Sequence, residues 1–256
     1  MLAKRLESIA NLLQETGSVE VSDLSRRYGV TEKTIRQDLI KLEELRIATR
    51  VHGGALPFKG ENYIFPVGER KNRYVQCKQR IAQRAYEMVT EDDIIFLDSG
   101  TTMLELAKLI NKRVIVITPD PYIQNELLTH EMVTLYSTGG RLKREGGSCT
   151  FIGSDAVHMI RGYHAKKYFI GASSLSLEQG LMLFSTDEIE VKRAMLKAAQ
   201  ESIALIDSSK IEQIAFVSLA GLGEINALVT DPGITEEQKA RIEEQGVTVY
   251  VCAPDT

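Results

Sequence analysis

A run of hydroxyl-bearing residues follows a short apolar stretch in the second quarter of the chain. Ile94–Leu97 leads directly into Asp98, Ser99, Gly100, Thr101 and Thr102, where a helical pattern begins. Gly100 would let the backbone approach an anion, the hydroxyls would donate hydrogen bonds, and the free N–H groups of a helix start favour negative charge. The segment suits a phosphate group, although the same residues could equally form a helix cap without a ligand.

A second polar segment follows another apolar stretch, because Leu205 and Ile206 lead into Asp207-Ser208-Ser209-Lys210. The Lys210 ammonium could neutralise phosphate charge. Since a carboxylate would repel a phosphate, we expect Asp98 either to accept a hydrogen bond from a sugar hydroxyl or to fix the amides of its own loop. We expect Lys192 to lie on a solvated helix face. Small or hydroxyl-bearing residues also follow other apolar stretches, namely Thr118, Gly139, Gly140 and Gly171.

Helix-like and strand-like patterns alternate from Val75 onward, which indicates an α/β domain with a sheet between helices. In such a sheet, ligands bind outside the carboxyl ends of the strands, where the polar segments lie. The predicted helices are 78–89, 102–110, 121–129, 187–200 and 235–245. The predicted strands are 94–97, 114–118, 133–137, 167–170, 203–206, 215–219, 227–230 and 247–251.

The first sixty residues show three short helical patterns followed by a hairpin. The helices are predicted over 2–15, 22–28 and from the N-cap Thr31 onward, with Gly29 in the turn before the third. Residues 47–51 and 55–56 predict two short strands around the turn His52-Gly53-Gly54, and this hairpin would form a wing. Together these patterns predict a winged helix-turn-helix.

The polar face of the third helix carries the chemistry expected of a DNA-binding surface. Arg36 and Gln37 are the candidate base readers, because Arg pairs with guanine and Gln with adenine. Thr31 and Thr34 suit phosphates, and Arg50 and His52 of the wing would contact the flanking backbone. The alternative is a plain helical bundle with a solvated charged face. The full set of predicted DNA contacts is Thr31, Lys33, Thr34, Arg36, Gln37, Lys41, Arg50 and His52.

The motif Thr31-x-x-Thr34-Ile35-Arg36-Gln37-Asp38-Leu39, with Arg50-x-His52-Gly53-Gly54-Ala55, resembles the signature of the DeoR family of sugar-catabolism repressors. The family usually has Arg where this chain has Gln37, and Gly where it has Arg46. The resemblance continues through Asp98–Thr102, Gly139-Gly140, Gly171, Lys192, Asp207-x-Ser209-Lys210 and Asp231. The chain departs from the family pattern at Thr118-Pro119-Asp120, Cys149-Thr150 and Ile211-Glu212.

The resemblance implies a Rossmann-like α/β sensor domain similar in fold to the group of ribose-phosphate isomerase, glucosamine-phosphate deaminase and CoA-transferase. It also implies a phosphorylated sugar as effector. The predicted effector contacts are Asp98, Ser99, Gly100, Thr101, Thr102, Thr118, Gly139, Gly140 and Lys210.

Composition and charge agree with a DNA-binding head on a larger sensor domain. Residues 1–75 contain 13 Lys and Arg against 10 Asp and Glu, a net charge of +3, and the rest of the chain carries 18 against 25, or −7. We expect a winged helix-turn-helix over residues 1–57, a linker over 58–74 and the sensor domain over 75–256. No apolar run is long enough to span a bilayer, so we expect a cytoplasmic protein without a membrane partner.

The three cysteines lack metal-ligand spacing, so we expect buried reduced thiols, no metal and no cofactor. The leading interpretation is a repressor, not an enzyme, that binds a double-stranded operator as a homodimer or homotetramer. One alternative is a sugar-phosphate isomerase or deaminase with a DNA-binding head, which would need a carboxylate or a histidine as acid or base. Asp98, Asp207 and Asp231 are available for this role, whereas the sequence does not place His130, His158 or His164 near the strand ends. Another is a purely structural DNA-binding protein.

Overall fold

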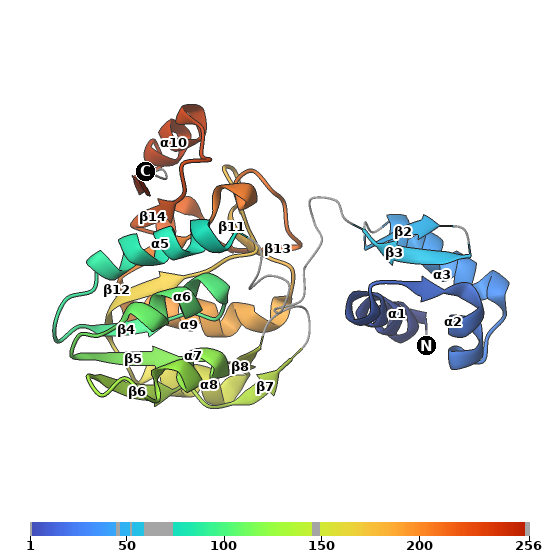
Figure 1. Ribbon diagram of the computed structural model, residues 1–256, viewed down its shortest axis with the longest axis horizontal. Helices are drawn as coiled ribbons and strands as arrows, with labels where there is room; N and C mark the ends of the chain where they lie inside the picture. The colour runs from blue at the N-terminus through green and yellow to red at the C-terminus, as the bar shows by residue number, and fades with distance from the viewer. Residues whose placement is uncertain (1, 45–46, 52, 59–73, 145–148, 254–256) are drawn as a thin grey trace. The chain divides into compact units, whose positions relative to one another are not determined.

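The computed structural model describes residues 2–44, 47–51, 53–58, 74–144 and 149–253. The chain forms two compact units, a smaller N-terminal unit and a larger C-terminal unit (Figure 1). Most of the predicted linker, 58–74, lies outside the described residues. The division into 1–57, 58–74 and 75–256 therefore stays a prediction.

The described part of the N-terminal unit contains the predicted helices α1 (Leu2–Thr16), α2 (Val21–Tyr28) and α3 (Glu32–Glu44). Gly29 ends α2 in the left-handed conformation with a φ of 62°, which glycine adopts without steric cost. The Thr31 hydroxyl oxygen accepts a hydrogen bond from the Thr34 amide at 3.3 Å, as expected of an N-cap. The helices pack around buried side chains that include Ile9, Leu24, Ile35, Leu39 and Leu42.

The predicted wing is formed by the antiparallel pair β2 (Ala48–Val51) and β3 (Gly54–Pro57). A third strand, β1 (Val19–Glu20), pairs with β3 and was not predicted, because two residues are too few for an alternating pattern. Gly54 is required where β1 meets β3, since a Cβ atom there would lie 2.1 Å from the Val19 carbonyl oxygen. The wing is thereby fixed to the start of α2.

The C-terminal unit is built on a seven-stranded sheet in which every neighbouring pair is parallel. The predicted α/β class with a Rossmann-like parallel sheet is confirmed. In spatial order the strands are β15 (Thr248–Val251), β14 (Ala227–Thr230), β12 (Ala199–Leu205), β9 (Ala165–Ile170), β4 (Ile94–Leu97), β5 (Val114–Thr118) and β6 (Val133–Ser137).

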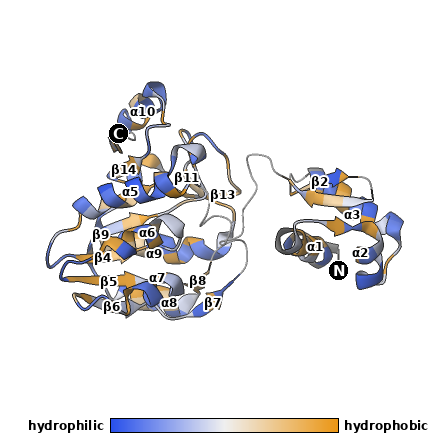
Figure 2. Ribbon diagram, viewed as in Figure 1, coloured by the Kyte–Doolittle hydropathy of each residue, from blue (hydrophilic) through white to orange (hydrophobic). Residues whose placement is uncertain are grey.

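Helices cover both faces of this sheet, so that apolar strands lie between amphipathic helices (Figures 1 and 2). One core contains side chains of α5 (Val75–Glu87), α6 (Thr101–Leu109) and α7 (Pro121–Leu127). The opposite core contains side chains of α8 (Ser154–Arg161), α9 (Ile189–Ala198) and α10 (Glu236–Glu243). Because β4, β9 and β12 are covered on both faces, their sequences are almost continuously apolar near their carboxyl ends.

Two small antiparallel sheets accompany the main sheet. One consists of β10 (Ser174–Ser176), β11 (Gly180–Leu183) and β13 (Val217–Ala220), and the other is the hairpin of β7 (Arg141–Lys143) and β8 (Thr150–Ile152). The strand predicted at 215–219 thus belongs to a separate sheet. The short strands β7, β8, β10 and β11 and helix α8 were not predicted. Three single-turn helices, η1 (Thr186–Glu188), η2 (Ser208–Lys210) and η3 (Leu222–Glu224), lie in described connections.

None of the helices in the described residues is long and apolar enough to cross a membrane. The three cysteines are free thiols. Burial raises the pKa of the Cys252 thiol to about 11, whereas Cys77 and Cys149 are only half-buried, contrary to the expectation of three buried thiols.

Candidate functional site

The carboxylate of Asp98 lies fully buried at the carboxyl end of β4 and holds its own loop together. One oxygen accepts from the Ser99 amide at 2.8 Å, and the other accepts from the Gly171 amide at 2.8 Å. Of the two roles expected for Asp98, this geometry corresponds to fixing backbone amides, because its oxygens are already bonded within the protein. The loop after β4 is thereby tied to the loop after β9.

Lys192, expected on a solvated helix face, is instead one of the most buried charges of the unit. Its side chain is 4% exposed, and its Nζ lies 2.5 Å from Asp98 Oδ2. Burial raises the pKa of Asp98 above its ordinary value, and the facing Lys192 ammonium opposes that rise. The expectation failed because Lys192 lies on the face of α9 that packs against the strand ends, a position the local charge pattern did not reveal.

The buried charges continue from Lys192 into a connected network. Glu188 Oε2 lies 3.9 Å from Lys192 Nζ, and Glu188 Oε1 accepts from Lys143 Nζ at 3.1 Å. Lys143, 5% exposed, also donates to the Ser185 hydroxyl at 2.8 Å. Sequence reasoning missed Lys143 and Glu188, because the hairpin that carries Lys143 was not predicted and the pairing joins residues far apart in sequence.

Groups able to bind an anion occur in the loop after β4, which carries Asp98, and at the start of β10. The Ser99 hydroxyl is buried and has no hydrogen-bond partner among the described residues, and the same holds for the Ser174 hydroxyl at the start of β10. Thr101 and Thr102 begin α6, and the first N–H groups of a helix have no partner within it. The Gly100 amide, in contrast, donates to Asp120 Oδ2 at 3.1 Å.

Thr118, Gly139 and Gly140, predicted as effector contacts, lie in turns at the ends of β5 and β6. The buried Thr118 hydroxyl oxygen accepts from the Asp120 amide at 3.2 Å, in the turn that leads to α7. The Gly139 amide donates to the Ser137 hydroxyl oxygen at 3.2 Å. Gly140 has a φ of 99°, and a Cβ atom there would lie 2.7 Å from the Ile152 carbonyl oxygen. These contacts support the local turns and the packing of the hairpin.

Lys210 lies in a second cluster, at the carboxyl end of β12, which is separated from β4 by β9. Its Nζ is 3.3 Å from Asp207 Oδ2. Burial opposes ionisation of Asp207, but the Lys210 ammonium, the Ser209 hydroxyl and the Lys78 charge together outweigh it and lower the pKa of that carboxyl. Beside this pair, Asp231 accepts from the Ser208 amide at 2.7 Å and from the Ser208 hydroxyl at 2.8 Å. The two clusters therefore both lie at the carboxyl ends of the parallel strands.

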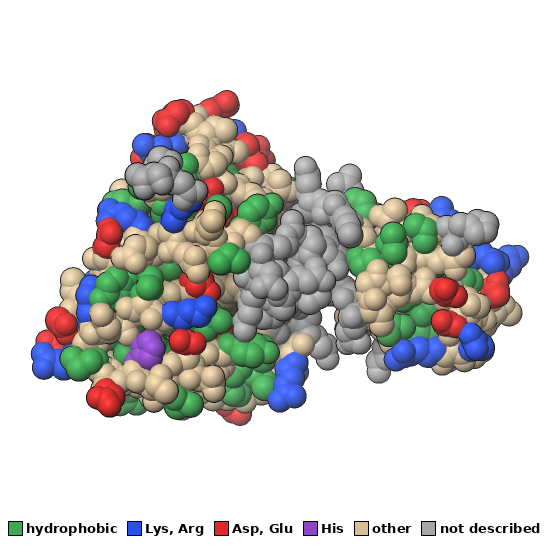
Figure 3. Space-filling view, viewed as in Figure 1, with side chains coloured by type: hydrophobic (Ala, Val, Ile, Leu, Met, Phe, Trp, Pro, Cys, Tyr) green, Lys and Arg blue, Asp and Glu red, His purple; other side chains and the backbone are tan. Residues whose placement is uncertain are grey.

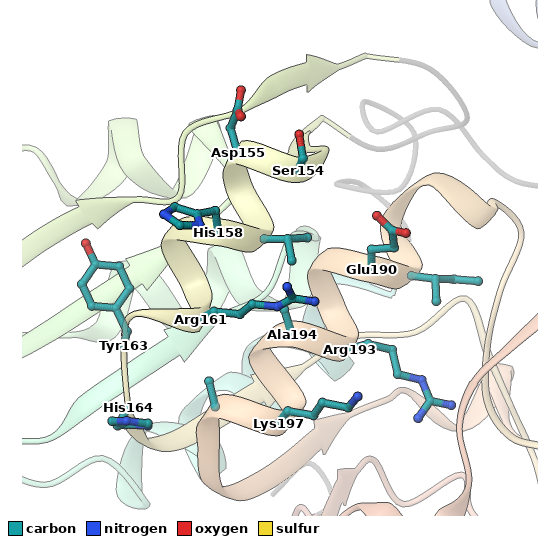
Figure 4. Close-up of a pocket in the computed structure, with 13 residues that line it drawn as sticks. Ser154, Asp155, His158, Arg161, Tyr163, His164, Glu190, Arg193, Ala194 and Lys197 are labelled. Atoms are coloured by element: carbon teal, nitrogen blue, oxygen red, sulfur yellow. The ribbon is translucent and has the colours of Figure 1, made fainter.

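A separate open groove of about 840 Å³ runs between α8 and α9, on a helical face rather than at the strand ends. Figure 4 shows Arg161 extending toward α9 and Tyr163 on the opposite side of α8. His158 and His164 line this groove, and a ring nitrogen of His130 lies 2.7 Å from the Ile110 carbonyl oxygen. The three histidines considered as acid or base groups are thus outside both strand-end clusters.

In the N-terminal unit, α3 exposes Lys33, Arg36 and Gln37 and half-exposes Thr34 and Lys41. The buried Asp38 holds this helix to α1, because it accepts two hydrogen bonds from the Arg5 guanidinium, at 2.6 and 3.1 Å. The predicted contact surface of α3 therefore has a fixed orientation within the unit.

Two predicted DNA contacts are paired with neighbouring carboxylates of the same unit. Arg36 lies 2.7 Å from Glu32 of α3, and Arg50 of the wing lies 2.7 Å from Glu43 of α3. Figure 3 shows basic and acidic side chains next to one another on the visible face of this unit. The Arg50 pair also joins the wing to α3. His52 lies outside the described residues.

No cluster of His, Cys, Asp and Glu suited to a metal ion occurs within the part of the chain that the structure describes.

Comparison with known proteins identifies the family of both units. The model for the DeoR C-terminal sensor domain matches residues 73–232, and the model for the DeoR-like helix-turn-helix domain matches residues 5–59. The lactose phosphotransferase system repressor of Streptococcus mutans is 33% identical over 236 residues, which cover 89% of this chain and 91% of that protein. The HTH-type transcriptional regulator GolR of Listeria innocua is 32% identical over 251 residues, covering 97% and 98%.

Solved structures similar to the chain include ribose 5-phosphate isomerase A of Methanocaldococcus jannaschii, with 19% identity, a TM-score of 0.38 and coverage of 52% of this chain and 53% of that one. The eIF2B delta subunit of Chaetomium thermophilum has 16% identity, a TM-score of 0.45 and coverage of 63% and 57%. Because both TM-scores are below 0.5, the assignment rests on the family matches and the curated relatives. The chain belongs to the DeoR family of transcriptional regulators, with a DeoR-like helix-turn-helix domain followed by a DeoR C-terminal sensor domain.

Proposed function

We propose that this regulator represses a sugar-catabolism operon and leaves its operator when a phosphorylated sugar binds at the strand ends of the C-terminal unit. The relative from Streptococcus mutans is a repressor of a lactose phosphotransferase system, which supports both the direction of regulation and the link to sugars. α3 and the wing would contact duplex DNA, with Arg36 and Gln37 reading bases.

The observation that carries the effector site is the buried network of Lys143, Glu188, Lys192 and Asp98 beside the unpartnered Ser99 hydroxyl. Buried ammonium groups and helix-start amides favour a dianionic phosphate, and Ser99 would donate a further hydrogen bond. Lys210 would contribute a cation from the end of β12. We retain Ser99, Gly100, Thr101, Thr102 and Lys210 as proposed ligands and add Lys143 and Lys192.

The effector would act by binding one arrangement of the protein more tightly than the other. Lys143 belongs to a hairpin and Lys192 to a helix, so an anion bound between them would favour one position of these elements. A homodimer or homotetramer would then present its paired heads to the operator with a different spacing.

The test combines a thermal-shift screen of phosphorylated sugars with operator binding measured by fluorescence anisotropy. An effector with micromolar affinity, present at millimolar concentration, should stabilise the protein by roughly 4 kcal/mol. The same sugar should weaken operator binding. Lys210→Ala and Lys143→Met should each reduce the shift, whereas Lys108→Ala, an exposed lysine on α6, should leave it unchanged. A full shift in both site variants would contradict the proposed site.

The enzyme alternative requires a free acid or base beside the substrate. Asp98 and Asp207 are each paired with a lysine, and Asp231 is bonded to Ser208. Turnover of ribose 5-phosphate or glucosamine 6-phosphate by the purified protein would favour the enzyme over the repressor.

A further inference from the structure

Strand β6 (Val133–Ser137) lies at one edge of the main sheet and pairs only with β5 among the described strands (Figure 1). The Val114 amide donates to the Met132 carbonyl, and the Thr138 amide donates to the Thr118 carbonyl. In a parallel ladder this pattern directs the N–H and C=O groups of Thr134 and Tyr136 toward β5. The alternate residues direct theirs to the open edge, namely Leu135 and Ser137, together with the Val133 carbonyl. The Val133 amide already donates to the His130 carbonyl at 2.9 Å.

The sequence of this edge lacks the features that usually prevent pairing with another strand. Exposed edges are commonly protected by charged residues, by proline or by a bulge. β6 reads Val-Thr-Leu-Tyr-Ser, and all five residues keep continuous register with β5. None of the described strands pairs with this regular, uncharged edge, which leaves it available to a strand of another chain.

Exposed apolar side chains gather around β6 more than around the opposite edge. Leu128 is 74% exposed, Met132 51%, Tyr136 41%, and Met159 of α8 40%. Leu128 lies one turn after Gln124, whose amide bonds to Ser137 of β6, so it is on the β6 side of α7. At the opposite edge, Val251 is the one large apolar residue of β15 that is exposed.

The location of Met159 follows from an aromatic contact. Tyr163, one turn after Met159, packs against Tyr136 with ring centroids 5.7 Å apart. Met159 is therefore near the β6 edge on the α8 face of the sheet. The four exposed side chains offer roughly 400 Å² of apolar area, about half of the ~800 Å² that each partner contributes to a stable interface.

We propose that two copies of this chain associate through β6, with the two strands antiparallel about a two-fold axis at Leu135. This register overlaps all of the edge-facing residues. Leu135 exchanges hydrogen bonds with its own copy at a Cα separation of about 5.5 Å, and the Val133 carbonyl accepts from the amide of Ser137 of the partner subunit. The two sheets become continuous, and α7 and α8 of each copy supply the remaining contact on the two faces.

A second copy of β6 fits this edge, because two identical antiparallel strands related by a two-fold axis present matching donors and acceptors to each other. In the same register, Thr134 lies directly opposite Tyr136 of the partner subunit on the α8 face. Cross-strand neighbours of this kind have Cβ atoms about 4.5–5.5 Å apart, close enough for charged substitutions to repel or attract.

The test measures the mass of the full-length protein by sedimentation velocity at micromolar concentration. Thr134→Lys and Tyr136→Glu should each halve the mass of the assembly, since each places an unpaired charge in the interface. The double variant Thr134→Lys/Tyr136→Glu sets opposite charges against each other twice and should restore the original mass. Thr248→Lys, at the exposed start of β15 on the other edge, is the matched control and should change nothing.

Far-ultraviolet circular dichroism of each variant below its melting transition checks folding, and unchanged spectra are expected because both side chains are exposed. A monomeric unsubstituted protein, or full mass in both single variants, would overturn the proposal. Loss of mass without restoration in the double variant would overturn the antiparallel register. Because no effector is added, the result is independent of the proposed sugar-phosphate site.

Discussion

Removing the Lys192 ammonium should destabilise the C-terminal unit in a pH-dependent way. Lys192→Met keeps much of the side-chain volume but leaves the Asp98 carboxylate buried without its cation. Asp98 is fully buried and Lys192 is 4% exposed, so water cannot replace the lost partner. Removing one member of a buried ion pair typically costs about 3 to 5 kcal/mol, and we expect a loss in that range at pH 7.

The sign of the pH dependence follows from the raised pKa of Asp98, which burial causes and Lys192 opposes. Without Lys192, the folded pKa rises further above the unfolded value of about 3.9. The folded state then binds the proton more tightly than the unfolded state, so stability falls as the pH rises between these two values, by up to about 1.4 kcal/mol per pH unit. The difference from the unsubstituted protein should therefore be smaller at pH 5 than at pH 7.

The assay is urea unfolding of the full chain followed by far-ultraviolet circular dichroism, because the protein has no tryptophan. Lys197→Met is the control, since Lys197 lies on the same helix and is exposed. Asp98→Asn/Lys192→Met should recover part of the lost stability, because the uncompensated charge is gone. A loss below about 1 kcal/mol, or a loss that is equal at pH 5 and pH 7, would refute a buried ionic contact between these residues.

Three further predictions concern other parts of the chain. Asp38→Asn should lower the stability of the N-terminal unit by about 1–2 kcal/mol, because Arg5 loses a charged partner, and thermal melting should show a decrease of roughly 5–10 °C. Burial raises the pKa of Asp93, but hydrogen bonds with Lys166, Lys167 and Thr90 together outweigh it and hold that pKa well below its usual range. Asp93→Asn should therefore destabilise the protein by about 2 kcal/mol at pH 7, and urea titrations should show this difference shrinking below about pH 4. Gly140→Ala should lower the free energy of unfolding by about 2–4 kcal/mol in the same assay, because the φ of Gly140 is 99° and a Cβ atom would clash with the Ile152 carbonyl oxygen. Gly139→Ala should lower it by only about 1 kcal/mol, because a Cβ atom there meets open space.

Local sequence signals predicted the elements whose patterns are long or bounded by clear caps. Strands 94–97, 114–118, 133–137 and 227–230 have the predicted bounds, because continuous apolar runs in parallel sheets contrast with the polar loops around them. The cap at Thr31 and the stop at Gly29 were equally readable, since capping depends on neighbouring residues. The winged helix-turn-helix and the α/β fold followed from these signals.

The candidate site was less predictable because its contacts are between distant segments. Asp98 and Lys192 are 94 residues apart. No local pattern distinguishes a helix lysine that pairs with a carboxylate at a strand end from a lysine on a solvated helix face. Lys143 was missed because β7 has three residues, too few for a detectable period. Gly140 was predicted as an effector contact, a role that stays a prediction, and its conformation and close packing are sufficient to require glycine.

The carboxylates beside Arg36 and Arg50 have a consequence for how the head discriminates among DNA sequences. Each phosphate neutralised by a protein cation normally releases a condensed counterion, which gives binding its steep dependence on salt. If Arg36 and Arg50 contact the duplex as proposed, each must exchange its glutamate partner for a phosphate. Such an exchange would release fewer counterions and add little attraction to arbitrary duplex. In the proposed complex with DNA, these internal pairs would therefore weaken binding to arbitrary sequences, and contacts with the correct bases would contribute a larger share of the affinity.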